Sequence, residues 1–289
     1  MSEKILTHLA EADAVLGGII RAVGPCGLEA RSDCHPFESL AQAIAHQQLH
    51  RTAANSILRR LVETCGQGAF PTPQRVLAAP PAMLRAAGFS TAKVAALRDL
   101  AQKTLSAVVP EAAVLLALSD EEIITRLTAV RGVGRWTVEM LLIFQLGRPD
   151  VLPVDDFGVR AGFRAAYGLS RMPHPKALAV WGERWRPYRS TAAWYLWRAV
   201  ELERAGKLPP PPERIRLPRI ARVRRRKRHS AQAARAAGPH GPARRAATAR
   251  RRAPLRRAGA SSAPPRRSGA RTRSRRPRAL RSRAPGSKR

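Results

Sequence analysis

The sequence predicts an all-α fold of two helical lobes, followed by a disordered basic C-terminal tail. About ten segments between residues 36 and 206 carry apolar side chains at helical spacing, and several of them end at a glycine. No alternating pattern typical of a strand runs beyond four residues. The charge is also uneven, since residues 209–289 hold 28 Lys and Arg against one acidic residue, a net +27 of the total +33.

This division predicts a helical domain at 1–208 and a tail at 209–289. The tail consists mainly of Arg, Ala, Pro, Ser and Gly, and after Ile220 it offers almost no large apolar side chains. Such a segment cannot offset the conformational entropy lost on ordering, so we expect disorder. Its charge favours nonspecific DNA binding through counterion release. A solubilising tail without a partner is the alternative.

The first predicted helices surround a polar loop. Pro36 suits the first turn of a helix whose apolar residues repeat up to Ile44. The sequence HQQLH at 46–50 interrupts this pattern, and a second helix follows at 51–64. The first ~30 residues fit no single pattern and stay ambiguous.

Capping residues mark the next helix starts. Thr72 followed by Pro73 begins a short helix, a second short helix at 80–87 is closed by Gly88, and Ser90 begins a longer helix. Ser119 and Glu122 have the spacing of a capping box. The remaining predicted helices follow in order: about 135–146, 155–167, 175–185 and 190–205.

The cysteine and histidine pattern argues against a metal centre or a disulfide framework. Cys26, Cys34 and Cys65 form no CxxC motif, and an odd count without a signal peptide predicts reduced thiols in a cytoplasm. His46 and His50 lack a third zinc ligand. No apolar run approaches the roughly 20 residues of a membrane span. We therefore expect a cytoplasmic, nucleoid-associated monomer without a membrane partner.

The sequence LTAVRGVGRW predicts a helix, a tight turn and a second helix. Gly132 and Gly134 flank Val133, which would plug into the core, and Arg135 follows. Glycines permit positive φ and close backbone approach. The amides at the start of the second helix form an anion site that suits a DNA phosphate without reading sequence. A plain turn between packed helices is the alternative.

An acid pair, Asp155-Asp156, precedes the next helix. Taken alone, acids at this position are usually N-caps stabilised by the helix dipole. The hairpin about 20 residues earlier changes this interpretation, because together the two motifs resemble a known family.

The chain resembles the helix–hairpin–helix Gly/Pro-Asp superfamily of DNA glycosylases, and within it the 3-methyladenine DNA glycosylase II (alkylpurine glycosylase) type. Four segments carry the resemblance in the family's order and together span most of residues 35–205: FESLAQAIAHQQLHRTAA at 37–54, VRGVGRWTVEMLL at 130–142, VLPVDDFGVR at 151–160 and ERWRPYRSTAAWYLW at 183–197. The basic tail lies outside the family pattern.

The resemblance implies that Asp156 is the catalytic carboxylate and that Asp155 is more suited to be the cap. Ordinary glycoside hydrolysis needs a second carboxyl group to protonate the leaving oxygen. An N3- or N7-alkylated purine already carries positive charge, so one acid suffices. Trp136 stands where bifunctional relatives carry a lysine nucleophile, which implies a monofunctional enzyme without lyase activity. The cysteine quartet of iron–sulfur branches is missing, so no cofactor is expected.

The resemblance also implies a base pocket formed by Trp136, Trp197, Phe157 and Met140. Aromatic faces attract electron-poor alkylated bases by stacking and cation–π interaction. Core packing is the alternative for each aromatic. Met140 departs from long family members, which can place a tyrosine there, and this bears on the range of accepted bases.

The loop at 46–50 corresponds to the family loop that fills the hole left by a flipped base. Gln48 is the candidate wedge, with Leu49 next, and a polar capping loop is the alternative. The family hairpin further implies a structural Na⁺ or K⁺ held by the backbone carbonyls of Thr128, Val130 and Val133.

The sequence therefore predicts a monofunctional DNA N-glycosylase that removes alkylated purines of the 3-methyladenine and 7-methylguanine class from duplex DNA and so initiates base-excision repair. One alternative is a non-catalytic DNA-binding or nucleoid-compacting protein on the same scaffold. Another keeps the enzyme but takes hypoxanthine or uracil, neutral bases that leave less readily.

Overall fold

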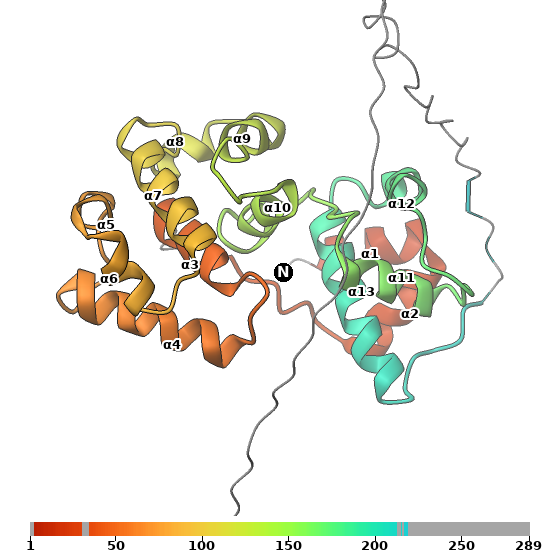
Figure 1. Cartoon of the computed structure of the whole chain (residues 1–289). Helices are drawn as coiled ribbons and strands as arrows, with labels where there is room; N and C mark the ends of the chain where they lie inside the picture. The colour runs from red at the N-terminus through yellow and green to blue at the C-terminus, as the bar shows by residue number, and fades with distance from the viewer. Residues whose placement is uncertain (1–2, 31–34, 213–214, 216, 219–289) are drawn as a thin grey trace, which may run out of the picture. The chain divides into compact units, whose positions relative to one another are not determined.

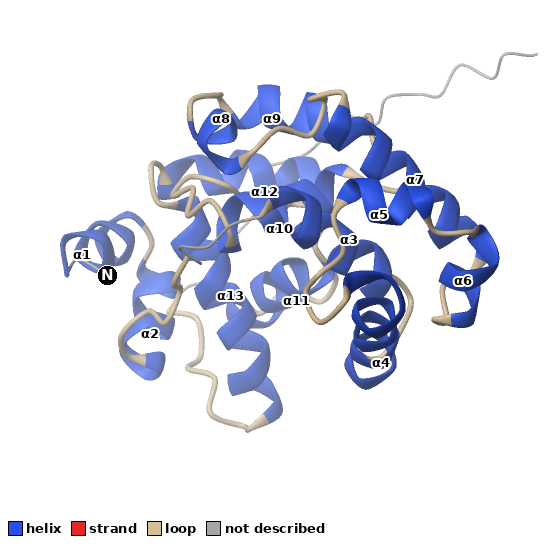
Figure 2. Ribbon diagram, turned by 90° about the vertical axis from the view of Figure 1, so that its left-hand side faces the viewer, coloured by secondary structure: helices blue, strands red, loops and turns tan. Residues whose placement is uncertain are grey.

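The computed structural model describes residues 3–30, 35–212, 215 and 217–218, and every regular element within them is a helix (Figure 2). The predicted all-α class is confirmed. The predicted tail lies almost wholly outside the described residues, so its disorder and its boundary at 208 stay predictions. In the described part of the chain, no helix is both long and apolar enough to cross a membrane.

Two hydrophobic cores confirm the predicted pair of lobes (Figure 1). The first lobe contains α3 (Pro36–His46), α4 (Arg51–Leu61), a π-helical turn at Val62–Gly66, α5 (Pro73–Ala78), α6 (Pro81–Ala86), α7 (Thr91–Leu105), α8 (Ala112–Leu116), α9 (Asp120–Leu127) and α10 (Arg135–Phe144). The second contains α1 (Glu3–Ala12), α2 (Ala14–Val23), α11 (Phe157–Ala166), α12 (Pro175–Gly182), a 3₁₀ turn at Glu183–Trp185 and α13 (Arg189–Arg204). Both ends of the helical chain therefore build the second lobe.

The predicted caps are confirmed. Thr72 and Ser90 each accept a hydrogen bond from the main-chain N–H three residues later. Ser119 and Glu122 form a complete capping box at the start of α9. Each cap satisfies N–H groups that have no partner within the helix. The short helix α8 was not predicted, and α1 and α2 resolve the ambiguous N-terminal segment.

A buried carboxylate joins the two ends of the second lobe. Asp13 is only 5% exposed, and its Oδ1 accepts two main-chain N–H groups at the start of α2. Its Oδ2 accepts the hydroxyl of Tyr167 and the indole N–H groups of Trp181 and Trp185. A buried carboxylate is tolerated only when it is hydrogen-bonded, and five donors meet that need here. Burial and the nearby Asp13 raise the pKa of Tyr167.

Packing also extends past the predicted domain boundary, because Ile215 and Leu217 contact the second core. Cys26 and Cys65 are free thiols, and burial raises the pKa of Cys26. Cys34 lies outside the described residues.

Helices α11 and α13 lie in close contact at Gly162. A Cβ atom built on Gly162 would lie 1.8 Å from the carbonyl oxygen of Leu196, a main-chain atom that cannot yield without moving α13. Glycine is therefore required here for helix contact, although its φ is ordinary for a helix.

We expect Gly162→Ala to destabilise the protein by more than about 2 kcal/mol, because the overpacked methyl group must separate two helices. Gly18→Ala is the matched control, since a Cβ there meets only Pro209 at 3.8 Å. Alanine in a helix interior should stabilise by about 0.5–1 kcal/mol at that position. Urea unfolding measures both, and equal midpoints for the two variants would contradict the packing argument.

Candidate functional site

The carboxylate of Asp156 is the centre on which three helices converge. Its Oδ1 accepts the main-chain N–H of Val159 at 2.7 Å and the indole N–H of Trp197 at 2.8 Å. Its Oδ2 accepts the indole N–H of Trp136 at 2.8 Å. Hydrogen bonds to an ionised acceptor are the stronger kind, so the arrangement holds both oxygens in place.

These donors come from both lobes. Trp136 lies on α10 of the first lobe, whereas Asp156 begins α11 and Trp197 lies on α13 of the second. Trp197 packs against both cores and stacks on Phe144 with ring centroids 5.6 Å apart. A Cβ on Gly158 would lie 2.7 Å from the Trp197 ring, so this glycine leaves room for the indole beside the carboxylate. The site therefore depends on the packing of one lobe against the other.

The interpretation of Asp155 as the helix cap is wrong. Asp156 itself caps α11 through Val159, while Asp155 stands in the preceding turn and is exposed. The turn, closed by a hydrogen bond from the Asp156 N–H to the Pro153 carbonyl, decides which acid faces the helix start. Asp156 is thus both the candidate catalytic residue and the N-cap of α11.

The aromatic side chains differ in exposure around this carboxylate. Trp136 is 47% exposed and Phe157 is 71% exposed, so core packing is excluded for both rings. Trp197 is half-buried, and its indole N–H donates a hydrogen bond directly to the Asp156 carboxylate. Met140 lies one turn after Trp136 on α10 and packs against the first core. Of the residues predicted to form the base pocket, two rings are therefore exposed, Trp197 is a half-buried hydrogen-bond donor, and Met140 faces the first core.

The hairpin has the predicted helix–turn–helix form. Gly132 has φ +77°, the left-handed region that favours glycine, and Val133 is buried in the first core. Gly134 is the N-cap residue of α10 and has an ordinary φ of −97°. As a glycine, it has no side chain that could cover the first N–H groups of the helix. A Cβ there would meet no protein atom within 4 Å. The first N–H groups of α10 therefore stand beside open space, as an anion site requires.

Arg135 is occupied by carboxylates. Its guanidinium hydrogen-bonds Glu121 and, at 3.0 Å, the buried Glu139. Arg135 lowers the pKa of Glu121, while burial raises the pKa of Glu139 against the opposing effect of Arg135. Main-chain amides, rather than this side chain, are what the hairpin presents to an anion.

The loop between α3 and α4 exposes its middle residues. Gln48, Leu49 and His50 are all exposed, and Gln48 adopts a left-handed φ of +57°. A non-glycine residue in this region is uncommon and marks a strained loop. His46 ends α3, so the two histidines of HQQLH lie at opposite ends of the loop.

Sequence reasoning missed three charged residues on α7 that support the hairpin and the loop. Asp99 accepts the Arg131 N–H at 2.7 Å, and Lys103 donates to the Ala129 carbonyl at 2.6 Å. Lys93 donates to two carbonyls at the end of α3. Their sequence signal is only the helical spacing of solvated charges, which does not point to partners distant in the chain.

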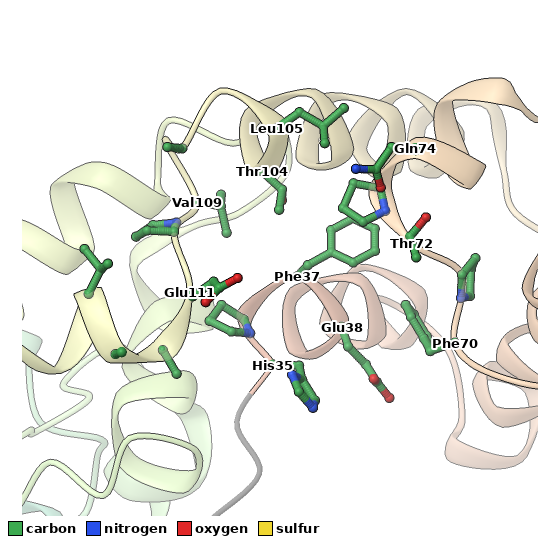
Figure 3. A pocket seen from close by; sticks show the side chains of 18 residues that line it. His35, Phe37, Glu38, Phe70, Thr72, Gln74, Thr104, Leu105, Val109 and Glu111 are labelled. Carbon is green, nitrogen blue, oxygen red and sulfur yellow. The ribbon is translucent and has the colours of Figure 1, made fainter.

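A groove in the first lobe, with a volume of about 930 Å³, opens between α3, α5 and the segment from the end of α7 to α8 (Figure 3). Phe37 and Phe70 meet edge to face in it, and Glu38 and Glu111 supply carboxylates. Its lining contains no lysine or arginine and shares no residue with the predicted site. A DNA phosphate would therefore find no counter-charge there.

The sequence matches a known protein family and is similar to individual known proteins. The family "HhH-GPD superfamily base excision DNA repair protein" matches residues 41–187. DNA-3-methyladenine glycosylase 1 of Schizosaccharomyces pombe is 39% identical over 211 residues, 69% of this chain and 91% of that protein. The alkylbase DNA glycosidase-like protein mag2 of the same organism is 33% identical, over 69% of this chain and 94% of its own.

Solved structures agree. The S. pombe 3-methyladenine DNA glycosylase (Mag1), solved in complex with abasic DNA, superposes with a TM-score of 0.62 over 69% of this chain and 97% of that one. The DNA-3-methyladenine glycosidase of Bacillus halodurans, 32% identical, superposes with a TM-score of 0.64 over 70% of this chain and 91% of its own.

The capping role of Asp156 gives a stability prediction. Asp156→Ala removes the cap and also the acceptor of both indole N–H groups, so it should cost more than about 1 kcal/mol of unfolding free energy. Asp156→Asn keeps one oxygen for Val159 and Trp197 and loses only the acceptor of the exposed Trp136 indole, so it should cost less. Urea unfolding of the two variants measures the difference. An equal loss in both would mean that the Val159 bond does not stabilise α11.

Proposed function

The chain belongs to the HhH-GPD superfamily of base excision DNA repair proteins, and from that membership we propose that it is a DNA N-glycosylase that excises alkylated purines from duplex DNA. The observation that carries the proposal is the carboxylate of Asp156, fixed by two indole N–H groups and a helix start beside the exposed ring of Trp136. The relatives named for 3-methyladenine and alkylbase substrates support the same reaction.

The two oxygens of Asp156 have different hydrogen-bond partners, and we assign them different roles. Oδ1 is held by Val159 and Trp197, which fixes the plane and position of the carboxylate. Among the described residues, Oδ2 accepts only the indole N–H of Trp136, whose ring is 47% exposed and so can be reached by an incoming base. We assign to Oδ2 the contact with the reacting sugar and water.

The reaction breaks the bond between C1′ of the deoxyribose and the purine nitrogen. The alkylated base takes the bonding electron pair and leaves as a neutral molecule, because it already carries a positive charge. Asp156 stabilises the positive charge that develops on the sugar and accepts a proton from the water that adds to C1′. A second carboxylic acid is unnecessary, in contrast to ordinary glycoside hydrolysis.

Recognition of the base follows from the exposed aromatic surface. A flipped purine with a positive charge is attracted to the faces of Trp136 and Phe157 by stacking and cation–π interaction. Neutral hypoxanthine or uracil would gain less from these rings and would also leave less readily. The arrangement therefore favours the alkylated class over the neutral one.

We propose further that the enzyme has no lyase activity. Strand cleavage by a Schiff base needs a lysine at the reacting sugar, and Trp136 occupies the place after the hairpin where lyase relatives carry it. Lys93 and Lys103 already donate to the carbonyls of the loop and the hairpin, respectively. Neither ammonium group is available as a nucleophile.

We propose that the hairpin holds a monovalent cation through main-chain carbonyls, because neutral oxygens supply no negative charge to balance a divalent ion. Thr128, Val130 and Val133 would hold it, although the Val130 carbonyl also accepts the Val133 N–H at 3.0 Å. Such an ion would add positive charge where the hairpin amides meet a phosphate. Exchanging Na⁺ or K⁺ for the bulky tetramethylammonium ion at constant ionic strength should weaken DNA binding if the site is used.

The decisive experiment measures release of free base from methylated duplex DNA. We expect the wild type to release methylpurines, Asp156→Asn to lose at least about 100-fold in rate by analogy with the loss of a preorganised electrostatic contact, and Asp155→Asn to stay near wild type. The abasic strand should remain uncut until alkali is added. Binding to the same duplex is the control, since neither variant removes a hairpin amide.

A wild type that binds the duplex but releases nothing would overturn the proposal and favour the alternative, a DNA-binding or nucleoid-compacting protein. Release of bases together with an Asp156→Asn variant of full activity would keep the enzyme but reject its assigned acid. Strand cleavage without alkali would reject the monofunctional assignment.

The basic tail should supply affinity rather than chemistry. A fragment of residues 1–218 retains Ile215 and Leu217, which pack on the second core, and removes most of the predicted tail. We expect excision at saturating DNA to persist, while affinity falls and depends less steeply on salt, because fewer counterions are released. Loss of excision at saturation, or an unchanged salt slope, would contradict this division. We propose that the tail acts on nucleoid DNA.

A further inference from the structure

The exposed loop between α3 and α4 is tied directly to the hairpin. The side-chain amide of Gln47 donates to the main-chain carbonyl of Gly132 at 2.8 Å, across 85 residues of sequence. Gln47 is partly buried, whereas Gln48, Leu49 and His50 are exposed. The first residue of the loop therefore reaches inward, and the next three face solvent.

The same loop is held from a second side by Lys93. Its ammonium donates to the carbonyls of Ala45 and Gln47, each at 2.7 Å. These carbonyls lie at the end of α3, where the helix leaves its last acceptors without intrahelical donors and the dipole favours a cation. Burial lowers the pKa of Lys93. The backbone on the α3 side of Gln48 is thus fixed.

One face of α7 holds both features. Lys93, Ala96, Asp99 and Lys103 follow one another at spacings of three or four residues, so they share a stripe. Ala96 packs beside Gly132, since a Cβ on that glycine would lie 3.5 Å from the Ala96 Cβ. Asp99 and Lys103 bind the turn on the other side, through the Arg131 N–H and the Ala129 carbonyl. Helix α7 therefore sets the distance between loop and hairpin.

The strained backbone of Gln48 fits this arrangement. A left-handed non-glycine residue costs on the order of 1 kcal/mol and persists only where its surroundings fix it. The turn around Gln48 is closed by the Leu49 N–H, which donates to the His46 carbonyl at 3.2 Å. It is held in place by the Lys93 bond to the Gln47 carbonyl and the Gln47 bond to Gly132. The Gln47 and Lys93 bonds are the contacts that join this turn to the hairpin and to α7.

We propose that Gln47 is a positioning residue that couples the hairpin, as a phosphate grip, to the loop that enters the duplex, so that phosphate binding and nucleotide flipping occur as one step. The inference deepens the proposed function and rests on it for the identity of the duplex. Gln47 itself acts through Gly132 and the loop backbone and does not touch the flipped base.

The test uses the full chain with Gln47→Met, which keeps the length of the side chain but cannot donate. Gln42→Met is the matched control, because Gln42 lies on α3, the helix that Gln47 follows, and its side chain donates to Glu38 at 2.9 Å rather than to the hairpin. The probes are one duplex with a tetrahydrofuran abasic analogue and the same duplex undamaged. A 2-aminopurine beside the analogue reports unstacking by its fluorescence.

We expect Gln47→Met to bind the undamaged duplex within about twofold of wild type, since the hairpin amides remain. Its preference for the abasic duplex and its 2-aminopurine signal should fall by about five- to tenfold, the effect of one lost hydrogen bond. Lys93→Met should reduce the same two signals, and the double variant should lose less than the product of the single losses, because both residues act on one loop.

Equal losses on both duplexes would overturn the coupling and leave Gln47 a general binding residue. A wild-type preference in Gln47→Met, or an equal effect of Gln42→Met, would also overturn it. Thermal unfolding of each variant shows whether the fold is intact, and the Lys93→Met arm decides if Gln47→Met fails to fold. None of these measurements requires excision, so they remain informative if base release is not observed and the proposed function itself fails.

Discussion

A single carboxylate joins the two lobes of this protein. Asp156 accepts N–H groups from α10, α11 and α13. Helix α10 packs in the first core, whereas α11 and α13 pack in the second. A charged acceptor with three donors resists displacement more strongly than neutral bonds would. The glycines at 158 and 162 matter for the same reason, because side chains there would push α13 away and carry Trp197 off the carboxylate. The site is thus a property of the lobe junction rather than of one motif.

Several charged side chains around the hairpin are paired with carboxylates or with main-chain carbonyls, and this separates positioning from affinity. Arg135 stands at the hairpin but is neutralised by Glu121 and Glu139, and Lys93 and Lys103 are committed to main-chain carbonyls. The hairpin presents main-chain amides to a phosphate, with the exposed Arg131 in the same turn, and contacts of this kind position a duplex without reading its bases. Most of the net charge lies instead in residues 209–289.

Interactions between residues close in the sequence were predictable, whereas those between distant residues were not. The caps at Thr72, Ser90 and Ser119 involve partners within three residues, so the sequence contains the whole interaction. The hairpin and Asp156 were predicted because their order resembles a family. The choice of Asp155 as cap failed because two adjacent acids are equivalent in sequence and only the turn at Pro153 distinguishes them.

The N-terminal helices show why the remaining structure escaped prediction, and they extend the functional unit beyond the matched family segment. Helix α2 packs against α11 and α13, and α1 packs against α2 and the 3₁₀ turn at Glu183–Trp185. Asp13 has its side-chain partners at Tyr167, Trp181 and Trp185, more than 150 residues away. Tyr167 stands directly after α11, the helix that Asp156 begins. Because α11 is held at one end by Asp13 and at the other by the donors to Asp156, the first 20 residues help to set the position of the carboxylate without approaching it. The helix that carries the chemistry is therefore positioned by segments from both ends of the chain.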